Sequence, residues 1–158
     1  MAIIEDATMT PDLAAALTAT GQPEAGFRAL ETAMQEAIGF RLFTIMQHDG
    51  TFNRRVYSNR ADAYPLGGAK PMRDIGWMRR VKSGMPSIST GEAEIRENFT
   101  DHAMIRSLGC STSLNLPVYW DARLLGVLNL LGRPRPYDAA DAALGMQFAA
   151  LAIPGLMA

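Results

Sequence analysis

The sequence has few of the residues on which disulfide and metal chemistry depend. Its 158 residues include one cysteine, Cys110, and two histidines, His48 and His102. A single cysteine excludes an intramolecular disulfide and a cysteine-rich zinc site, and the two histidines lie too far apart to form a local ligand pair. We therefore expect no metal site and a protein that works in a reducing compartment.

The sequence also lacks an excess of charge of either sign. Its 15 basic and 16 acidic residues give a formal net charge of −1. Nucleic-acid surfaces and polybasic membrane patches both need a positive excess, so neither nucleic acid nor a membrane is an expected partner. The expected partner is a small molecule or another protein.

No apolar run has the form of a membrane span. The most membrane-like stretch, residues 139–158, is interrupted by Asp141 and by Pro154 and Gly155, which are expected to end the last helix. A spanning helix needs about 20 predominantly apolar residues. Residues 1–7 carry acidic groups where a signal peptide needs basic ones, and no apolar segment follows. We expect a cytoplasmic protein.

The composition suits one packed domain. Hydrophobic residues make up 48% of the chain and charged residues 20%. A chain of this length buries on the order of 70% of the surface that its unfolded form exposes, so it can build a core without disulfides. We expect an N-terminal extension with a short helix over residues 1–22 and a single domain over residues 23–158.

Helical patterns lie near both ends of the chain. Thr10 followed by Pro11 is typical of a helix start and predicts a short helix over residues 11–20. Apolar residues at helical spacing predict a second helix over residues 23–38, and another helix is expected to follow Asp138. These helices flank the predicted strands.

Alternating polar and apolar residues predict two antiparallel hairpins. The first joins residues 40–48 to residues 51–58 through Asp49 and Gly50, a pair that tolerates the positive φ of a tight turn. The second spans residues 111–131. With the helices, these hairpins predict an α+β domain built on an antiparallel sheet.

The middle of the chain is irregular in pattern. Residues 59–72 contain prolines and glycines and no regular period. A short helix is expected over residues 73–83, a short strand over residues 87–90, and one or two helical turns within residues 92–108.

Three segments resemble parts of GAF domains, the small sensory modules of bacterial signalling proteins and phosphodiesterases. Residues 81–86 resemble the end of the helix before the family's central strand, residues 108–118 its fourth strand, and residues 121–130 the following turn and fifth strand. The resemblance covers about residues 23–153. It implies a central antiparallel sheet with the terminal helices on one face and an irregular cover of helices and loops over a ligand pocket on the other.

The resemblance narrows the ligand only in part. Members of the family bind cyclic nucleotides, bilins, haem or small metabolites, so the fold alone does not choose among them. The asparagine-lysine, phenylalanine and aspartate-glutamate signature of the cyclic-nucleotide binders is absent at the required spacing, and bilin attachment normally accompanies neighbouring domains. We expect a small polar or carboxylate-bearing metabolite, no resident cofactor, and signal transduction without a fused output domain.

The candidate ligand-binding residues are polar or aromatic groups of the predicted sheet and cover. Asn129 lies among apolar strand residues, so its amide needs a partner in the interior or in a cavity. Ser113 and Asn115 share one face of the preceding strand. Bonding to nearby backbone is the alternative role for these three. The candidates from the cover are Tyr64, Lys70, Trp77, Phe99, Asp101 and His102.

An enzyme is the alternative function. Free methionine-R-sulfoxide reductases resemble this chain in being single-domain proteins, but they use several cysteines, and only Cys110 is present here. His102 would suit a hydrolase or isomerase if the side chain of Asp101 converged on it. Because a reactive thiolate needs a lowered pKa that no pattern here indicates, we favour binding over catalysis.

The terminal helices also predict how a signal would leave the domain. They are rich in alanine, leucine and methionine, which suits packing between two copies of the chain. We expect a homodimer, with the signal passed through dimer geometry or to a signalling protein partner.

Overall fold

A computed structural model describes residues 11–158. The predicted helix cap at Thr10 and the acidic start of the chain lie outside these residues. Seven helices and six strands are described. The strands are β1 Leu42–His48, β2 Phe52–Ser58, β3 Ala69–Pro71, β4 Ser87–Thr90, β5 Thr112–Trp120 and β6 Arg123–Leu131. The helices are α1 Pro11–Thr18, α2 Glu24–Ala37, α3 Gly76–Lys82, α4 Gly91–Asn98, α5 His102–Ser107, α6 Ala139–Ala150 and α7 Ile153–Met157.

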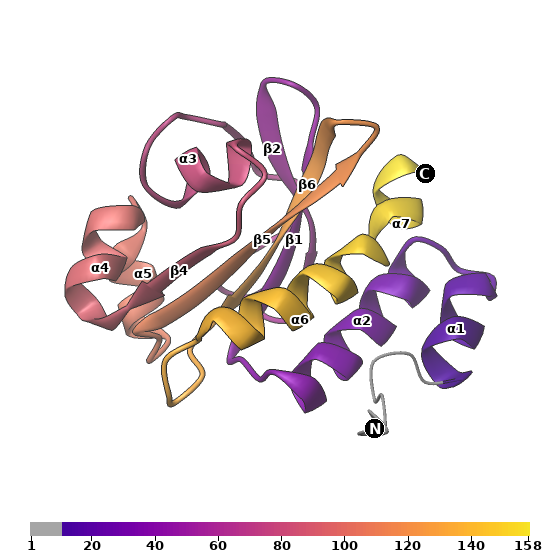
Figure 1. The fold of residues 1–158 in the computed structure, drawn as a ribbon, viewed down its shortest axis with the longest axis horizontal. Coiled ribbons are helices and arrows are strands. Elements are labelled where there is room, and N and C mark those ends of the chain that lie inside the picture. Colours follow the sequence, from indigo (N-terminus) through magenta and orange to yellow (C-terminus); the bar gives the residue numbers. More distant parts are fainter. Residues whose placement is uncertain (1–10) are drawn as a thin grey trace, which may run out of the picture.

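The strands form one antiparallel sheet covered on both faces. Its order is β3-β2-β1-β6-β5-β4, so the β1–β2 and β5–β6 hairpins meet at the central pair β1–β6. Helices α2 and α6 lie side by side on one face, whereas α3, α4 and α5 lie on the other (Figure 1). These three helices and the loop between β2 and β3 form the cover. The predicted α+β class and the predicted covering of the sheet are confirmed.

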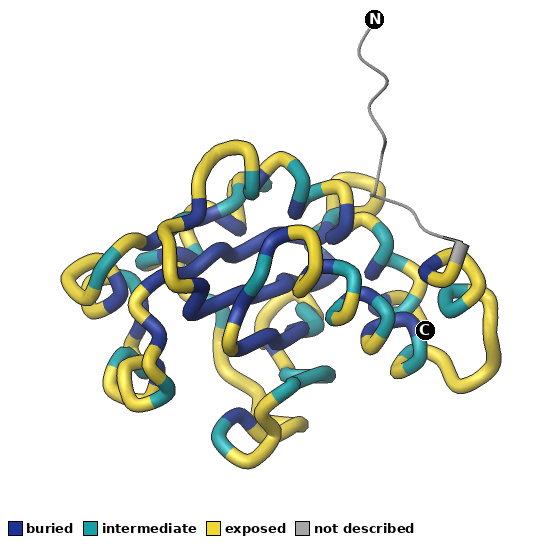
Figure 2. Tube along the Cα trace, turned by 90° about the horizontal axis from the view of Figure 1, so that it is seen from below, coloured by how far each residue is buried: buried dark blue, intermediate teal, exposed yellow. Residues whose placement is uncertain are grey.

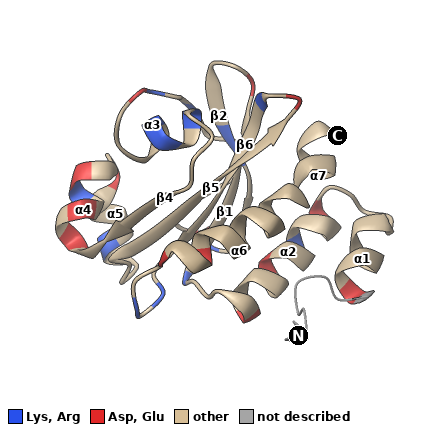
Figure 3. Cartoon of the chain, viewed as in Figure 1, with Lys and Arg blue, Asp and Glu red and all other residues tan. Residues whose placement is uncertain are grey.

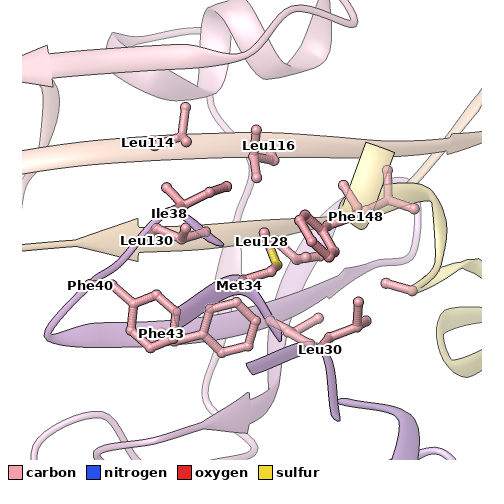
Figure 4. Close-up of a cluster of buried hydrophobic side chains, with 14 of the residues drawn as sticks. Leu30, Met34, Ile38, Phe40, Phe43, Leu114, Leu116, Leu128, Leu130 and Phe148 are labelled. Atoms are coloured by element: carbon pink, nitrogen blue, oxygen red, sulfur yellow. The ribbon is translucent and has the colours of Figure 1, made fainter. Parts of the chain in front are cut away.

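Alternation along the strands supplies a hydrophobic core on each face. In β6, Leu128 and Leu130 face α2 and α6, whereas Val127 and Leu131 face the cover. The first core includes Phe43 and Phe148, both almost fully buried, and Figure 4 shows these aromatic rings among the leucines of the strands. The central strands are accordingly buried along most of their length (Figure 2).

Both hairpin turns form where the sequence predicts them. Gly50 has φ +103°, and the carboxylate of Asp49 accepts hydrogen bonds from the backbone N–H groups of Thr51 and Phe52. In the second turn, Asp121 and Ala122 have φ values of 52° and 58°, the left-handed geometry that matches the twist of two-residue hairpins. These turns fix the register that places polar residues on the cover face.

Two predictions about individual elements are wrong. Residues 69–71, predicted to be irregular, form the edge strand β3, in which Lys70 pairs with Asn53. Helix α6 ends at Ala150, and the Pro154–Gly155 pair predicted to end it lies inside α7. Proline is tolerated there because the first turn of a helix has no use for its missing N–H group.

The segment between β6 and α6 is held by a buried ion pair. The guanidinium of Arg133 contacts Oδ2 of Asp141 at 2.5 Å, and these side chains are 5% and 13% exposed. Arg133 also donates to the carbonyl oxygens of Ile38 at 3.2 Å and Arg135 at 3.0 Å, and to that of Pro136. Asp141 in turn forms a capping box with Asp138 at the start of α6. The pair thus joins α2, the loop and α6.

Charges lie on the outside of the cover with both signs present. In Figure 3, α3 is largely basic, because it carries Arg79, Arg80 and Lys82. Helix α4 has charges of both signs with an acidic excess, from Glu92, Glu94, Glu97 and Arg96. Among the described residues, no helix combines the length and the apolar character that crossing a bilayer requires.

Candidate functional site

A small cavity lies between the sheet and the cover. Its volume is about 70 Å³, and strands β1, β2, β3 and β6 together with α3, α5 and the loop before α5 contribute its walls. Six of the nine residues predicted to bind a ligand line it: Tyr64, Lys70, Trp77, Phe99, Asp101 and Asn129. Residues far apart in sequence are therefore brought to one place.

Two stacked aromatic rings form one wall of the cavity. The ring centroids of Trp77 and Phe99 lie 6.0 Å apart with planes inclined by 24°. Both side chains are buried, Trp77 from α3 and Phe99 from the residue after α4. Such a wall offers an apolar surface to the carbon skeleton of a small molecule.

A hydrogen bond joins two segments of the cover beside the cavity. The hydroxyl of Tyr64 donates to Oδ2 of Asp101 at 2.6 Å. Burial, together with this bond to a carboxylate, raises the pKa of Tyr64, so the hydroxyl keeps its proton. Asp101 immediately precedes α5, but its side chain does not cap that helix.

Arg55 is a cavity residue that the sequence did not reveal. Its guanidinium lies 4.8 Å from the centroid of the Tyr64 ring, and Nη1 donates to the carbonyl oxygen of Pro65 at 3.0 Å. Its Nε is buried and has no hydrogen-bond partner among residues 11–158. Burial lowers the pKa of Arg55, while the neighbouring Tyr64 and Asp101 act in the opposite direction.

The cavity is lined by more positively charged than negatively charged side chains. Arg55 and Lys70 are cations, and Asp101 is the carboxylate that lines the same space. Lys70 is exposed on the edge strand β3, at the mouth of the site. The lining therefore carries a surplus of positive charge, which favours an anionic ligand.

A row of polar groups begins at the floor of the cavity and continues into the interior of the protein. Asn129 Nδ2 donates to Oγ1 of Thr44 at 3.1 Å, and Asn115 Nδ2 donates to Oδ1 of Asn129 at 2.7 Å. Thr44 lines the cavity with Asn129, whereas Asn115 and Ser113 are fully buried one strand away and do not line it. Thr44 was also missed, although it is the polar residue opposite Asn129 in the register.

The two residues considered for catalysis lie elsewhere. His102 and Cys110 both line a second cavity of about 190 Å³, between α4 and α5, together with Glu92, Arg96 and Arg106. Since the carboxylate of Asp101 is bonded to Tyr64, the structure does not pair it with His102. Burial raises the pKa of Cys110 despite the nearby Arg41 and Arg60, which disfavours a thiolate. Among the described residues, no three His, Cys, Asp or Glu side chains gather as a metal site would require.

No protein-family model and no curated protein matches the sequence. Solved structures do match. The GAF domain of a phosphoenolpyruvate-protein phosphotransferase from Coxiella burnetii superposes with a TM-score of 0.73 and 12% identity, over 92% of this chain and 89% of that one. The GAF domain of a two-component sensor histidine kinase from Bacillus halodurans gives 0.64 and 13%, over 82% of this chain and 95% of that one.

An enzyme has a similar structure too. The free methionine-R-sulfoxide reductase from Neisseria meningitidis, in complex with its substrate, gives a TM-score of 0.58 and 14% identity, over 80% of this chain and 72% of that one. At such identities the likeness concerns the fold. The six-stranded sheet, the covered cavity and these superpositions together identify the chain as a GAF-fold protein.

Proposed function

We propose that this protein is a sensory domain that binds a small carboxylate-bearing metabolite between the sheet and the cover. The observation that carries the proposal is the guanidinium of Arg55, whose buried Nε has no partner among the described residues. A buried donor on a charged group is costly to leave unpaired, and a ligand carboxylate would satisfy it with a charge-assisted hydrogen bond. Lys70 supplies a second cation at the mouth of the same cavity.

The size of the cavity limits the ligand. Pockets for drug-sized ligands occupy about 300 to 1,000 Å³, whereas this one has about 70 Å³. A short-chain acid of a few carbon atoms suits this space, with its carboxylate toward Arg55 and its carbon atoms against Trp77 and Phe99. A longer acid would require the cover to move outward, which would break the Tyr64–Asp101 hydrogen bond.

Binding without turnover is favoured over thiol chemistry. The cavity with the cationic surplus does not contain Cys110, and the thiol is buried with a raised pKa. A nucleophilic cysteine needs the opposite shift. The similarity to the GAF domain of a sensor histidine kinase supports a sensory role.

The transmission of the signal is part of the same proposal. We place the protein in the cytoplasm as a homodimer that packs through its terminal helices. Helix α6 supports this arrangement because its exposed positions are mostly alanine, with Ala139, Ala140, Ala143 and Ala150 among them. A ligand that shifts the cover would then also shift the strands of the sheet, on which α2 and α6 pack. A partner protein would detect the resulting change in the position of these two helices.

Tryptophan fluorescence tests the binding proposal. The sequence has two tryptophans, of which Trp77 lines the cavity and Trp120 is 53% exposed, so a Trp120→Phe background leaves Trp77 as the reporter. We expect acetate, propionate, lactate or pyruvate to change its emission saturably. Arg55→Met should abolish the change, because it keeps an unbranched side chain but removes the cation.

The neighbouring arginine offers a matched control. Arg54→Met removes an exposed arginine from the same strand that does not line the cavity, and it should bind like the parent protein. Native mass spectrometry of freshly purified protein adds an unbiased search for a co-purifying acid. The proposal is wrong if no carboxylate binds, or if Arg55→Met and Arg54→Met behave alike.

A further inference from the structure

We propose that Thr44 donates a hydrogen bond to the carboxylate of the ligand, and that Asn115 sets the direction of this bond from outside the cavity. The inference rests on the proposed function, because it concerns how the same site recognises its ligand. It assigns a contact role to Thr44 and a positioning role to Asn115.

The three residues of the relay, Thr44, Asn129 and Asn115, form a straight line across three strands. Thr44 in β1 is the register partner of Asn129 in β6, which is in turn the register partner of Asn115 in β5. Directly opposite residues on one face of an antiparallel pair are close enough for their side chains to interact. All three are buried, with exposed fractions of 4%, 6% and 0%.

The hydrogen bonds of the relay all run toward the cavity. Asn115 donates through Nδ2 to Asn129 Oδ1, and Asn129 donates through Nδ2 to Thr44 Oγ1. A threonine hydroxyl has one hydrogen to donate in addition to its lone pairs. Because Thr44 accepts from Asn129 and lines the cavity, its hydrogen is available to an acceptor atom inside.

The charges of the cavity agree with this direction. In the opposite direction, Thr44 would donate to Asn129 and present lone pairs to the ligand. Arg55 and Lys70 attract an anion to the same space, and an anion is matched by donors rather than by lone pairs. Successive hydrogen bonds that point the same way also polarise one another, which strengthens the last donor.

Substitution of Thr44 tests the contact with propionate as the probe. In the Trp120→Phe background, Thr44→Val removes the hydroxyl at nearly constant shape, and we expect the dissociation constant for propionate to rise about tenfold, the loss of one charge-assisted bond. Thr44→Ser keeps the hydroxyl and should stay within about twofold of the parent protein. Equal weakening by both variants would mean that Thr44 acts through packing, and would overturn the inference.

Substitution of Asn115 tests the positioning role. In Asn115→Asp the carboxylate cannot donate to Asn129, so the amide of Asn129 must turn until its Nδ2 donates to the new carboxylate. Its Oδ1 then faces Thr44, whose hydroxyl donates to Asn129 and no longer to the ligand. We expect the preference for propionate over propionamide, an uncharged molecule of the same shape, to fall about fivefold, since one such bond is worth this order of affinity. A merely structural defect would weaken both molecules alike. Asn115→Leu removes the donor to Asn129 without adding a charge, so a fall in the same preference in this variant separates the direction of the bond from repulsion between the new carboxylate and propionate.

Ser113 provides the matched control. It lies on the same strand and is equally buried, but it belongs to neither hydrogen bond of the relay, so Ser113→Ala should keep the parent preference. If the buried charge prevents Asn115→Asp from folding, the two Thr44 variants decide. If Arg55→Met abolishes propionate binding but Thr44→Val leaves it unchanged, the relay is refuted and the proposed function stands. An absence of carboxylate binding in the parent protein would refute both proposals.

Discussion

The hydroxyl of Tyr64 lies 2.6 Å from Oδ2 of Asp101, although the two residues are 37 positions apart in the chain. The bond joins the loop before β3 to the residue before α5, and both residues line the cavity. The guanidinium of Arg55 lies over the same tyrosine ring, 4.8 Å from its centroid. Two separate segments of the cover are therefore fastened to each other beside the cavity.

Removing the Tyr64 hydroxyl should loosen the cover. Tyr64→Phe keeps the ring and its contact with Arg55 but loses the bond to Asp101, at an expected cost of about 1–2 kcal/mol in the free energy of unfolding. Hydrogen exchange should accelerate in residues 60–72 more than in the central strands. Tyr137→Phe is the control, because that hydroxyl bonds to the carbonyl oxygen of Gly39, on the face of the sheet opposite the cover. Equal exchange in both variants would contradict the fastening role.

The hairpins could be predicted because their signals are local. Asp49 and Gly50 specify a tight turn by their own conformational preferences, and alternation then places every second residue on one face. This is why Ser113 and Asn115 were expected to share a face of their strand, and the register places Asn115 directly opposite Asn129. Their bond to each other, rather than to a ligand or the backbone, depends on strand pairing that no local pattern encodes.

The missed features depend on long-range pairing. Arg54 and Arg55 are adjacent, and a register shift between Ile45 and Met46 of β1 interrupts the alternation of its partner strand, so the sequence does not tell which arginine faces the cavity. The edge strand β3 has three exposed residues, including a proline, and forms only because β2 offers it a free edge. Position in the sheet, rather than residue type, decides both cases.

The acid stability of the protein should depend on Asp141. Its bond to Arg133 holds the pKa of this carboxyl below its ordinary value. The lowered pKa stabilises the folded state at pH values above the ordinary pKa of about 4, and this stabilisation is lost as the pH falls through the lower folded value. Asp141→Asn should cost about 3–5 kcal/mol at neutral pH, because it leaves the buried Arg133 without its counter-charge.

Urea unfolding at several pH values checks this prediction, since the variant should lose less stability on acidification than the parent protein. Asp62 is the control carboxylate. Its bond to Arg60 lowers its pKa to about 2, but both side chains are solvent-exposed, so Asp62→Asn should unfold like the parent protein. An Asp141→Asn variant with the parent's stability and acid response would contradict the role of the ion pair.

Cys110 should react slowly with alkylating reagents. Burial raises the pKa of its thiol, so the thiolate fraction at pH 8 is smaller than that of a free cysteine, and the rate should increase as the pH rises toward the shifted value. We expect alkylation by iodoacetamide at pH 8 to be at least about tenfold slower than in the same protein unfolded in urea. A native rate equal to the unfolded rate would restore the thiol-dependent alternative.

Gly126 should tolerate no side chain, because a Cβ atom there would lie 2.2 Å from the carbonyl oxygen of Met46 on the paired strand β1. The obstacle is backbone at the centre of the sheet, which cannot turn aside as a side chain can. Gly126→Ala should therefore lower the free energy of unfolding by about 1–3 kcal/mol or more.

Gly68 is the matched control, since a Cβ atom added there would meet no heavy atom within 4 Å and its φ is not positive, so Gly68→Ala should be neutral or slightly stabilising. Denaturant midpoints of the two variants make the comparison, and similar midpoints would mean that β1 and β6 do not approach each other as closely as the Gly126–Met46 contact requires.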